Sequence, residues 1–167
     1  MERDSVQDVP PGARQLAPGQ WRLSLLVAGV VIILFGVGGW IYSQAQGNQA
    51  ATAFNDGNTY AGQGDVNNAI ASYDQAIKLQ PNFPEAYYRR GLAYATKGLL
   101  DVAISDFTQA ITLKSNYAEA YYNRAIAYQK KNQKDAAVAD LQKVLSLSQD
   151  AMLRQQANTA LATLGGK

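Results

Sequence analysis

The alternation of hydrophobic and polar positions divides the chain into three zones. Residues 1–22 are mostly polar and hold Pro10, Pro11 and Pro18, a composition that predicts a flexible tail without a packed core. Residues 23–42 read LSLLVAGVVIILFGVGGWIY and carry no charge. From about residue 50 onward, apolar residues recur at helical spacings between polar ones. We therefore expect an all-α protein in which one long apolar helix precedes a series of amphipathic helices.

The apolar segment 23–42 is long enough to cross a bilayer. A helix of that length spans about 30 Å, the thickness of a hydrocarbon core. Trp21 lies at one edge and Trp40 and Tyr42 at the other, where interfacial aromatic residues are found. A cleavable signal peptide is the alternative, with Ser43–Ala45 as its small-residue cleavage site. Because the segment is longer than a usual signal-peptide core, we favour a single transmembrane helix that is retained.

Flanking charges predict the orientation of this helix. Arg14 and Arg22 precede it, whereas the first basic residue after it is Lys78. The positive-inside rule then places the N-terminus in the cytoplasm and the C-terminal domain on the extracytoplasmic side, periplasmic or lumenal. The polar linker 43–49 is short, so we expect that domain to work close to the lipid bilayer.

Small residues recur every three to seven positions along one side of the predicted membrane helix: Gly29, Gly36, Gly39 and Ser43. Small residues let a second helix approach closely, so this side is a candidate packing face for a partner transmembrane helix. The alternative is that glycine is simply common in membrane helices.

The amphipathic zone contains an internal repeat. Residues 85–94 (EAYYRRGLAY) and 119–128 (EAYYNRAIAY) are 34 residues apart and identical at seven of ten positions. Units that begin at Ala50, Pro84 and Ala118 are in phase, without insertions. Position 8 of each unit is small (Gly57, Gly91 and Ala125), and position 11 is tyrosine (Tyr60, Tyr94 and Tyr128). Position 20 is alanine (Ala69, Ala103 and Ala137), and position 24 is large and apolar (Tyr73, Phe107 and Leu141).

This pattern resembles the tetratricopeptide repeat (TPR), a 34-residue helix–turn–helix unit, over residues 50–151. The resemblance implies an α-solenoid of three TPR helix pairs at 50–83, 84–117 and 118–151, followed by a capping helix and tail at 152–167. The chain departs from the pattern at its repeat ends, where Pro81 has no counterpart in the later units, and at Val144, which replaces a small residue.

Several details of the solenoid can be predicted from the pattern. We expect turns at 62–65, 97–98 and 132–133, and Asp65 and Asp101 at or near helix starts. In the capping helix we expect Met152 to face the last repeat and Arg154 to face water. The first tyrosine of each pair, Tyr87 and Tyr121, is expected in the core.

The resemblance also implies a concave groove, lined by the first helix of each unit, that accepts a peptide or a partner helix. The residues of this chain at groove positions include aromatic side chains and an arginine, the usual anchors of protein interfaces. The candidate partner-binding residues are Phe54, Asn58, Tyr88, Arg89, Leu92, Tyr122, Asn123 and Ile126.

One TPR subclass holds the C-terminal carboxylate of chaperone tails through lysine, asparagine and arginine side chains. Asn58 fits one site of that clamp, but Phe54 and Glu119 stand where it needs lysine, and Arg89 and Asn123 do not restore it. Since Glu119 would repel a carboxylate, we predict that this chain does not bind such tails.

Composition argues against other classes of function. The net charge is +2, and the basic residues are scattered, which does not favour nucleic-acid binding. The chain has no cysteine or histidine, so it lacks the usual thiol, zinc and histidine-based catalytic sites. Asp74, Asp106 and Asp140 recur near the repeat period and are interpreted as solvated positions rather than a metal cage. We predict no enzymatic activity and no cofactor.

The sequence thus predicts a membrane-anchored protein–protein interaction module. The preferred hypothesis is a scaffold or assembly factor for a membrane protein complex. The alternative is a permanent structural subunit of a large membrane complex, such as a photosynthetic or respiratory one.

Overall fold

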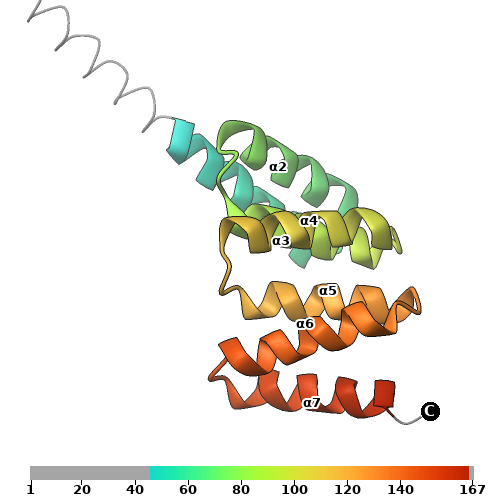
Figure 1. Ribbon diagram of the computed structural model, residues 1–167. Coiled ribbons are helices and arrows are strands. Elements are labelled where there is room, and N and C mark those ends of the chain that lie inside the picture. The colour runs from blue at the N-terminus through green and yellow to red at the C-terminus, as the bar shows by residue number, and fades with distance from the viewer. Residues whose placement is uncertain (1–45, 166–167) are drawn as a thin grey trace, which may run out of the picture. The chain divides into compact units, whose positions relative to one another are not determined.

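The computed structural model describes residues 46–165, which form seven helices. The first helix comprises residues 46–62 of the described part, and six further helices follow it (Figure 1): α2 (Val66–Leu79), α3 (Pro84–Thr96), α4 (Leu100–Leu113), α5 (Ala118–Lys130), α6 (Lys134–Leu147) and α7 (Ala151–Gly165). The predicted all-α solenoid of three helix pairs and a capping helix is confirmed. Residues 46–49 of the predicted linker belong to the first helix.

The predicted membrane helix 23–42, with its packing face of Gly29, Gly36, Gly39 and Ser43, lies outside the described residues. Among residues 46–165, the structure holds no helix with the length and apolar character needed to span a bilayer.

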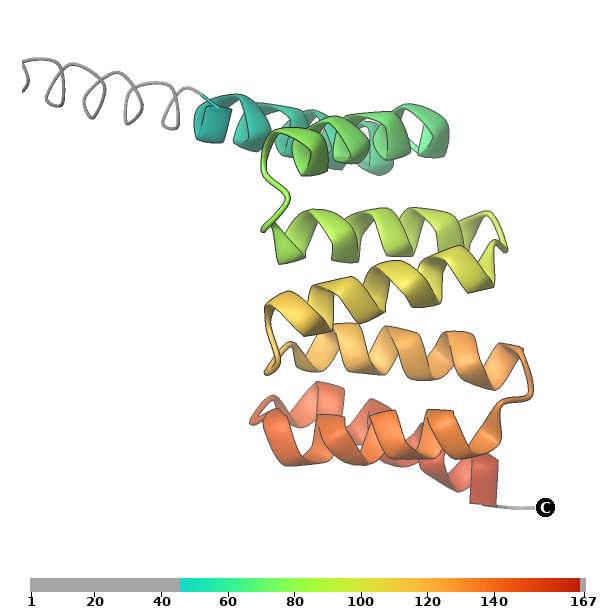
Figure 2. The same cartoon turned by 45° about the horizontal axis from the view of Figure 1, so that its top comes forward.

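Successive helix pairs stack on one another along the solenoid (Figure 2). The pair α3 and α4 packs between α2 and α5, and α6 packs between α5 and α7. The first helices of successive units also touch, because α3 contacts α5 and α5 contacts α7. We call the surface formed by the helix 46–62, α3, α5 and α7 the first-helix face.

The turn inside each unit has a residue with left-handed backbone conformation at position 15. Gly64, Gly98 and Asn132 all have positive φ, at +79°, +75° and +59°. In the second unit the N–H of Leu99 then donates to the carbonyl of Tyr94 at 3.0 Å, and the same bond recurs in the other two units. A left-handed residue of this kind closes a helix, and Gly and Asn tolerate it best. The three predicted turns are therefore confirmed.

Close helix crossing in each unit depends on matched sizes at positions 8 and 24. A Cβ added to Gly57 would lie 2.5 Å from the ring of Tyr73, and one added to Gly91 would lie 2.8 Å from the ring of Phe107. The third unit instead pairs Ala125 with the smaller Leu141, and both are buried. The core therefore holds either glycine against an aromatic ring or alanine against leucine.

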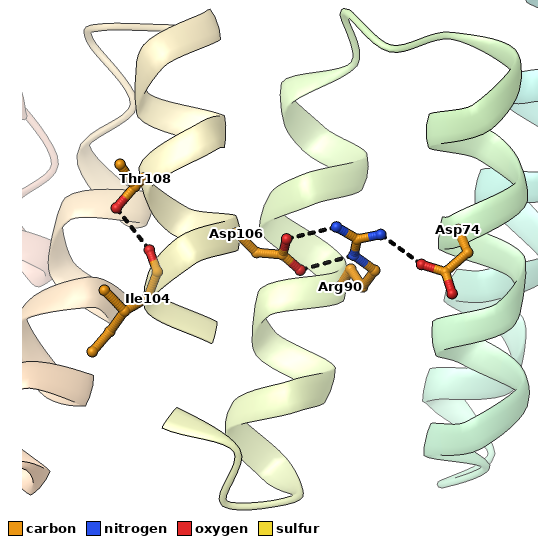
Figure 3. Close-up of polar contacts among 5 residues, drawn as sticks. All are labelled: Asp74, Arg90, Ile104, Asp106 and Thr108. Carbon is orange, nitrogen blue, oxygen red and sulfur yellow. Dashed lines mark hydrogen bonds and ion pairs between the residues drawn. The ribbon is translucent and has the colours of Figure 1, made fainter. Parts of the chain in front are cut away.

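A buried ion pair links the two helices of the second unit and ties them to the first (Figure 3). The guanidinium of Arg90 donates two hydrogen bonds to Asp106, at 2.8 and 2.7 Å, and a third to Asp74 at 2.5 Å. The hydrogen bonds to Asp106 raise the pKa of Arg90, which therefore stays charged. Arg90 also lies beside the rings of Tyr87 and Tyr94.

The third unit repeats this arrangement. Arg124 donates two bonds to Asp140, at 2.7 and 2.8 Å, and a third to the hydroxyl of Thr108 at 3.0 Å. The interpretation of Asp106 and Asp140 as solvated positions was wrong: they are 4% and 6% exposed. Burial is tolerated because each carboxylate receives a two-pronged bond from arginine.

Predictions for the helix starts are confirmed. Asp65 caps α2 by accepting a hydrogen bond from the N–H of Asn68, and Asp101 lies in the first turn of α4.

Tyr87 and Tyr121, which were expected in the core, are half-buried rather than fully buried. They pack against the core clusters and beside Arg90 and Arg124.

The capping helix corrects two predictions. Met152 is 70% exposed, because the buried side of α7 passes through Leu153, Ala157 and Ala160 and leaves the preceding residue off that side. Arg154 is half-buried, and its guanidinium donates to the carbonyls of Leu145 and Ser148. These carbonyls lie at the end of α6, where no further helical N–H is available to them.

Candidate partner-binding face

Three pockets follow one another along the first-helix face. The Arg89 pocket, about 300 Å³, lies between the first unit and α3. The Lys130 pocket, about 400 Å³, lies between α3, α4 and α5. The Tyr122 pocket, about 450 Å³, lies between α5 and α7. Because Leu92 and Thr96 line both the Arg89 and the Lys130 pockets, those two adjoin.

Five of the eight candidate groove residues line these pockets. Arg89 and Leu92 line the Arg89 pocket, Leu92, Asn123 and Ile126 line the Lys130 pocket, and Tyr122 lines the Tyr122 pocket. Phe54, Asn58 and Tyr88 line none of the three. The sequence pattern therefore brought together residues from α3 and α5 that share one surface.

Phe54 and Tyr88 are held in aromatic clusters of their own units. The ring of Phe54 lies 5.8 Å from Tyr73 and 4.9 Å from Phe83. The ring of Tyr88 lies 6.0 Å from Phe107 and 4.9 Å from Tyr117 in the same way. Phe83 and Tyr117 both occupy position 34 of the repeat. The aromatic residue at position 34 is visible in the sequence, and it indicates that Phe54 and Tyr88, both at position 5 of their units, pack within those units.

The two candidate asparagines also have partners within the fold. The side-chain carbonyl of Asn58 accepts a hydrogen bond from the hydroxyl of Tyr73 at 3.0 Å. The amide of Asn123 donates to the hydroxyl of Tyr88 at 3.1 Å and so connects the second unit to the third. Burial raises the pKa of Tyr73 and of Tyr88, so both hydroxyls stay protonated and keep these hydrogen bonds.

Tyr122 differs from the aromatic residues at the same position in the other units. Position 34 of its unit is Ala151 and position 24 is Leu141, so no ring occupies the places that Phe83 and Tyr73 take in the first unit. Tyr122 lies instead beside an uncharged set of side chains that sequence reasoning missed, mostly on α7: Gln129, Met152, Gln155, Gln156, Thr159 and Thr163. The exposed side of α7 thus extends the first-helix face by one more pocket.

The charges on this face are unevenly distributed. Arg89 and Lys130 are both exposed, and neither forms a hydrogen bond or ion pair within the described residues. No acidic side chain lines any of the three pockets. The Arg89 and Lys130 pockets are therefore positive, and the Tyr122 pocket is neutral.

Comparisons with solved structures agree on the architecture of this domain. The Arabidopsis OM64 TPR domain aligns with a TM-score of 0.67 at 24% identity, covering 71% of this chain and 96% of that one. The first TPR domain of Spaghetti (RPAP3), solved with an HSP90 peptide SRMEEVD, aligns with a TM-score of 0.65 at 26% identity over 71% and 94%. MamA aligns with a TM-score of 0.64 at 29% identity over 73% and 72%.

A comparison with curated proteins gives no match. Models of protein families do match, and their matches lie within the repeat region of the structure. A TPR repeat model matches residues 57–98 and 97–132, and a tetratricopeptide repeat model matches residues 118–150. The matched residues, 57–150, make up more than half of the chain, which therefore belongs to the tetratricopeptide repeat family.

Proposed function

We propose that this chain is a membrane-anchored interaction module that binds a segment of a partner protein along its first-helix face. TPR domains act in protein–protein interaction, and the solved RPAP3 domain holds a peptide. The observation that carries the proposal is the row of three pockets, lined by five of the eight residues that the repeat pattern selects. A row of pockets on one face suits an extended segment better than a single small ligand.

The proposal includes the apolar segment 23–42 as a membrane anchor. Its twenty uncharged residues and its flanking tryptophans support this role. Arg14 and Arg22 favour a cytoplasmic N-terminus, with the repeats on the extracytoplasmic side. Anchored in this way, the domain would gather partners at the membrane surface, as a scaffold or assembly factor for a membrane protein complex does.

The proposed partner is not a chaperone tail. Phe54 stands where the carboxylate clamp needs lysine, and its ring is packed between Tyr73 and Phe83. The carbonyl of Asn58 is already bonded to the hydroxyl of Tyr73. Glu119 is exposed and would repel a terminal carboxylate.

Affinity capture from mild detergent extracts tests the binding role. Leu92→Ser with Ile126→Ser removes apolar surface from the Arg89 and Lys130 pockets, and Val102→Ser removes an exposed apolar side chain on α4 that lines none of the three. We expect the double variant to lose its partners while Val102→Ser retains them, with both showing wild-type circular dichroism. Retention of every partner by a folded double variant would refute the proposed binding face.

Protease access in sealed membranes tests the anchor and its orientation. We expect the repeats to resist a protease added on the cytoplasmic side and to be digested after the membrane is opened. Digestion of the repeats from the cytoplasmic side would show the opposite orientation, and release of the chain by alkaline carbonate would contradict membrane anchoring.

A further inference from the structure

We propose that the Arg89 and Lys130 pockets recognise an acidic side chain, aspartate or glutamate, within an extended and otherwise apolar segment of the partner. This inference deepens the proposed function and rests on it, because it specifies the chemistry of the segment that the first-helix face would bind.

Arg89 and Lys130 differ from the basic residues that follow them in the sequence, because those residues are paired within the fold. Arg90, next to Arg89, is held by Asp106 and Asp74, and Lys131, next to Lys130, pairs with Asp101. Arg124 and Arg154 are likewise occupied, by Asp140 and by backbone carbonyls.

Among the four arginines of residues 46–165, Arg89 is the one that the fold leaves without a polar partner. In each of these two basic pairs, one side chain is paired within the solenoid and the other is available at a pocket.

The surroundings of Arg89 and Lys130 favour an anion that is partly removed from water. Leu92 lines both pockets, and Phe107, Ile126 and Ala127 line the Lys130 pocket, so the floor beneath the two cations is largely apolar. Ion pairs over apolar surface are less screened than those in open solvent. A carboxylate here would make charge-assisted hydrogen bonds while its neighbouring residues cover the floor.

The acidic residues near this face do not already satisfy the two cations. Glu85 pairs with Lys114 at 3.3 Å, and Glu119 lines none of the three pockets. Repulsion by Glu119 would disfavour a partner with many negative charges. We therefore infer one or two acidic residues in the segment rather than an acidic tract.

The carboxylate is assigned to a side chain rather than to a chain terminus because the Lys130 pocket has another pocket on each side. The Lys130 pocket lies between the Arg89 pocket and α5, and α5 in turn lines the neutral Tyr122 pocket. A segment that lies along all three pockets passes through the positive region and places uncharged residues against Tyr122 and the glutamines of α7.

Peptide selection on the full chain in detergent micelles tests this inference. The probe is a library of random twelve-residue peptides whose C-termini are fused to a phage coat protein, so that no free terminal carboxylate is offered. The enriched sequences are then synthesised with amidated C-termini, and their Kd values are measured by fluorescence anisotropy. Arg89→Gln with Lys130→Gln is the test variant, and Lys143→Gln, which removes an exposed lysine from α6, is the matched control.

We expect wild-type and control proteins to enrich peptides with an aspartate or glutamate next to apolar residues. The test variant should raise their Kd about tenfold or more, and added salt should weaken wild-type binding severalfold. Enrichment of neutral or basic peptides, or an unchanged Kd in the test variant, would overturn the inference. If those peptides still lost binding with Leu92→Ser and Ile126→Ser, the proposed function would stand. Binding insensitive to that double variant would refute both.

Discussion

Gly91 is the position where a single added methyl group should be felt most clearly. A Cβ at this residue would lie 2.8 and 2.9 Å from two ring carbons of Phe107 and 3.2 Å from the Cβ of Asp106. Neither neighbour can easily move, since the ring is fully buried and Asp106 is held by two hydrogen bonds from Arg90. We therefore expect Gly91→Ala to destabilise the solenoid, although alanine is the better helix former.

Two opposing effects set the size of this change. Overpacking of a rigid core costs about 1–3 kcal/mol, and the immobile neighbours place Gly91→Ala in the upper half of that range. Replacing a helical glycine by alanine returns about 1 kcal/mol. The net loss in free energy of unfolding should be about 1–2 kcal/mol.

The third unit suggests the rescue, because it pairs Ala125 with Leu141. Phe107→Leu alone should be destabilising by about 1–3 kcal/mol, since it leaves a cavity beside Gly91. In the double variant Gly91→Ala, Phe107→Leu, the methyl group fills part of that cavity. The two losses should then fall short of additivity by about 1–2 kcal/mol.

Urea unfolding of the full chain, followed by far-ultraviolet circular dichroism in one mild detergent, measures this cycle. Ala125→Gly is a useful control, because it should be destabilising in a unit that has no ring to accommodate. If Gly91→Ala were as stable as the wild type, or if the two changes simply added, the size matching between positions 8 and 24 would not be what determines the helix crossing.

Three further predictions concern the rest of the solenoid. Asp106→Asn should lower the free energy of unfolding by about 2–3 kcal/mol, because it removes the buried carboxylate and leaves the half-buried Arg90 with only the exposed Asp74 as a charged partner. Asp74→Asn removes an exposed carboxylate and should cost less than about 1 kcal/mol in the same urea titration, so equal effects would contradict the role given to burial. Gly98→Ala should cost about 1–2 kcal/mol because its φ is +75°, and a thermal scan that shows no loss would contradict that account of the turn. Burial raises the pKa of Tyr88 and Tyr117, so the folded state keeps protons that the unfolded chain loses above about pH 10. The free energy of unfolding should therefore be fully present below that pH and fall above it, and it should fall less steeply in Tyr117→Phe. An unchanged slope in that variant would contradict the assignment.

The repeat period accounts for most of what could be predicted from the sequence. Three in-phase copies determine which helices pair, and the small residues at position 8 indicate where they cross. The left-handed residues at position 15 were also predictable in place, since glycine and asparagine mark such turns. These features are local or recur at one spacing, so a single sequence reveals them.

Long-range partnerships were harder to predict. Arg90 and Asp106 are 16 residues apart on different helices, and the same separation recurs between Arg124 and Asp140. That recurrence was a usable sign of an ion pair, but a charged residue with no known partner is interpreted as solvated by default.

The capping helix shows a different limit. Its periodicity did not separate Met152 from the buried side formed by Leu153, Ala157 and Ala160, and it could not reveal that the carbonyls at the end of α6 bind Arg154. The Tyr122 pocket is lined mostly by residues of α7, which lies outside the three repeat units, so the repeat pattern did not predict it.

Photo-crosslinking in intact membranes tests most directly whether the first-helix face binds a partner. A benzophenone amino acid is placed in the full chain at Ile126, on the Lys130 pocket, or at Val102, on the exposed side of α4. We predict a discrete crosslinked product from position 126, lost when Leu92→Ser is added, and no such product from position 102. A product from position 102 alone, or equal products from both positions, would contradict the account.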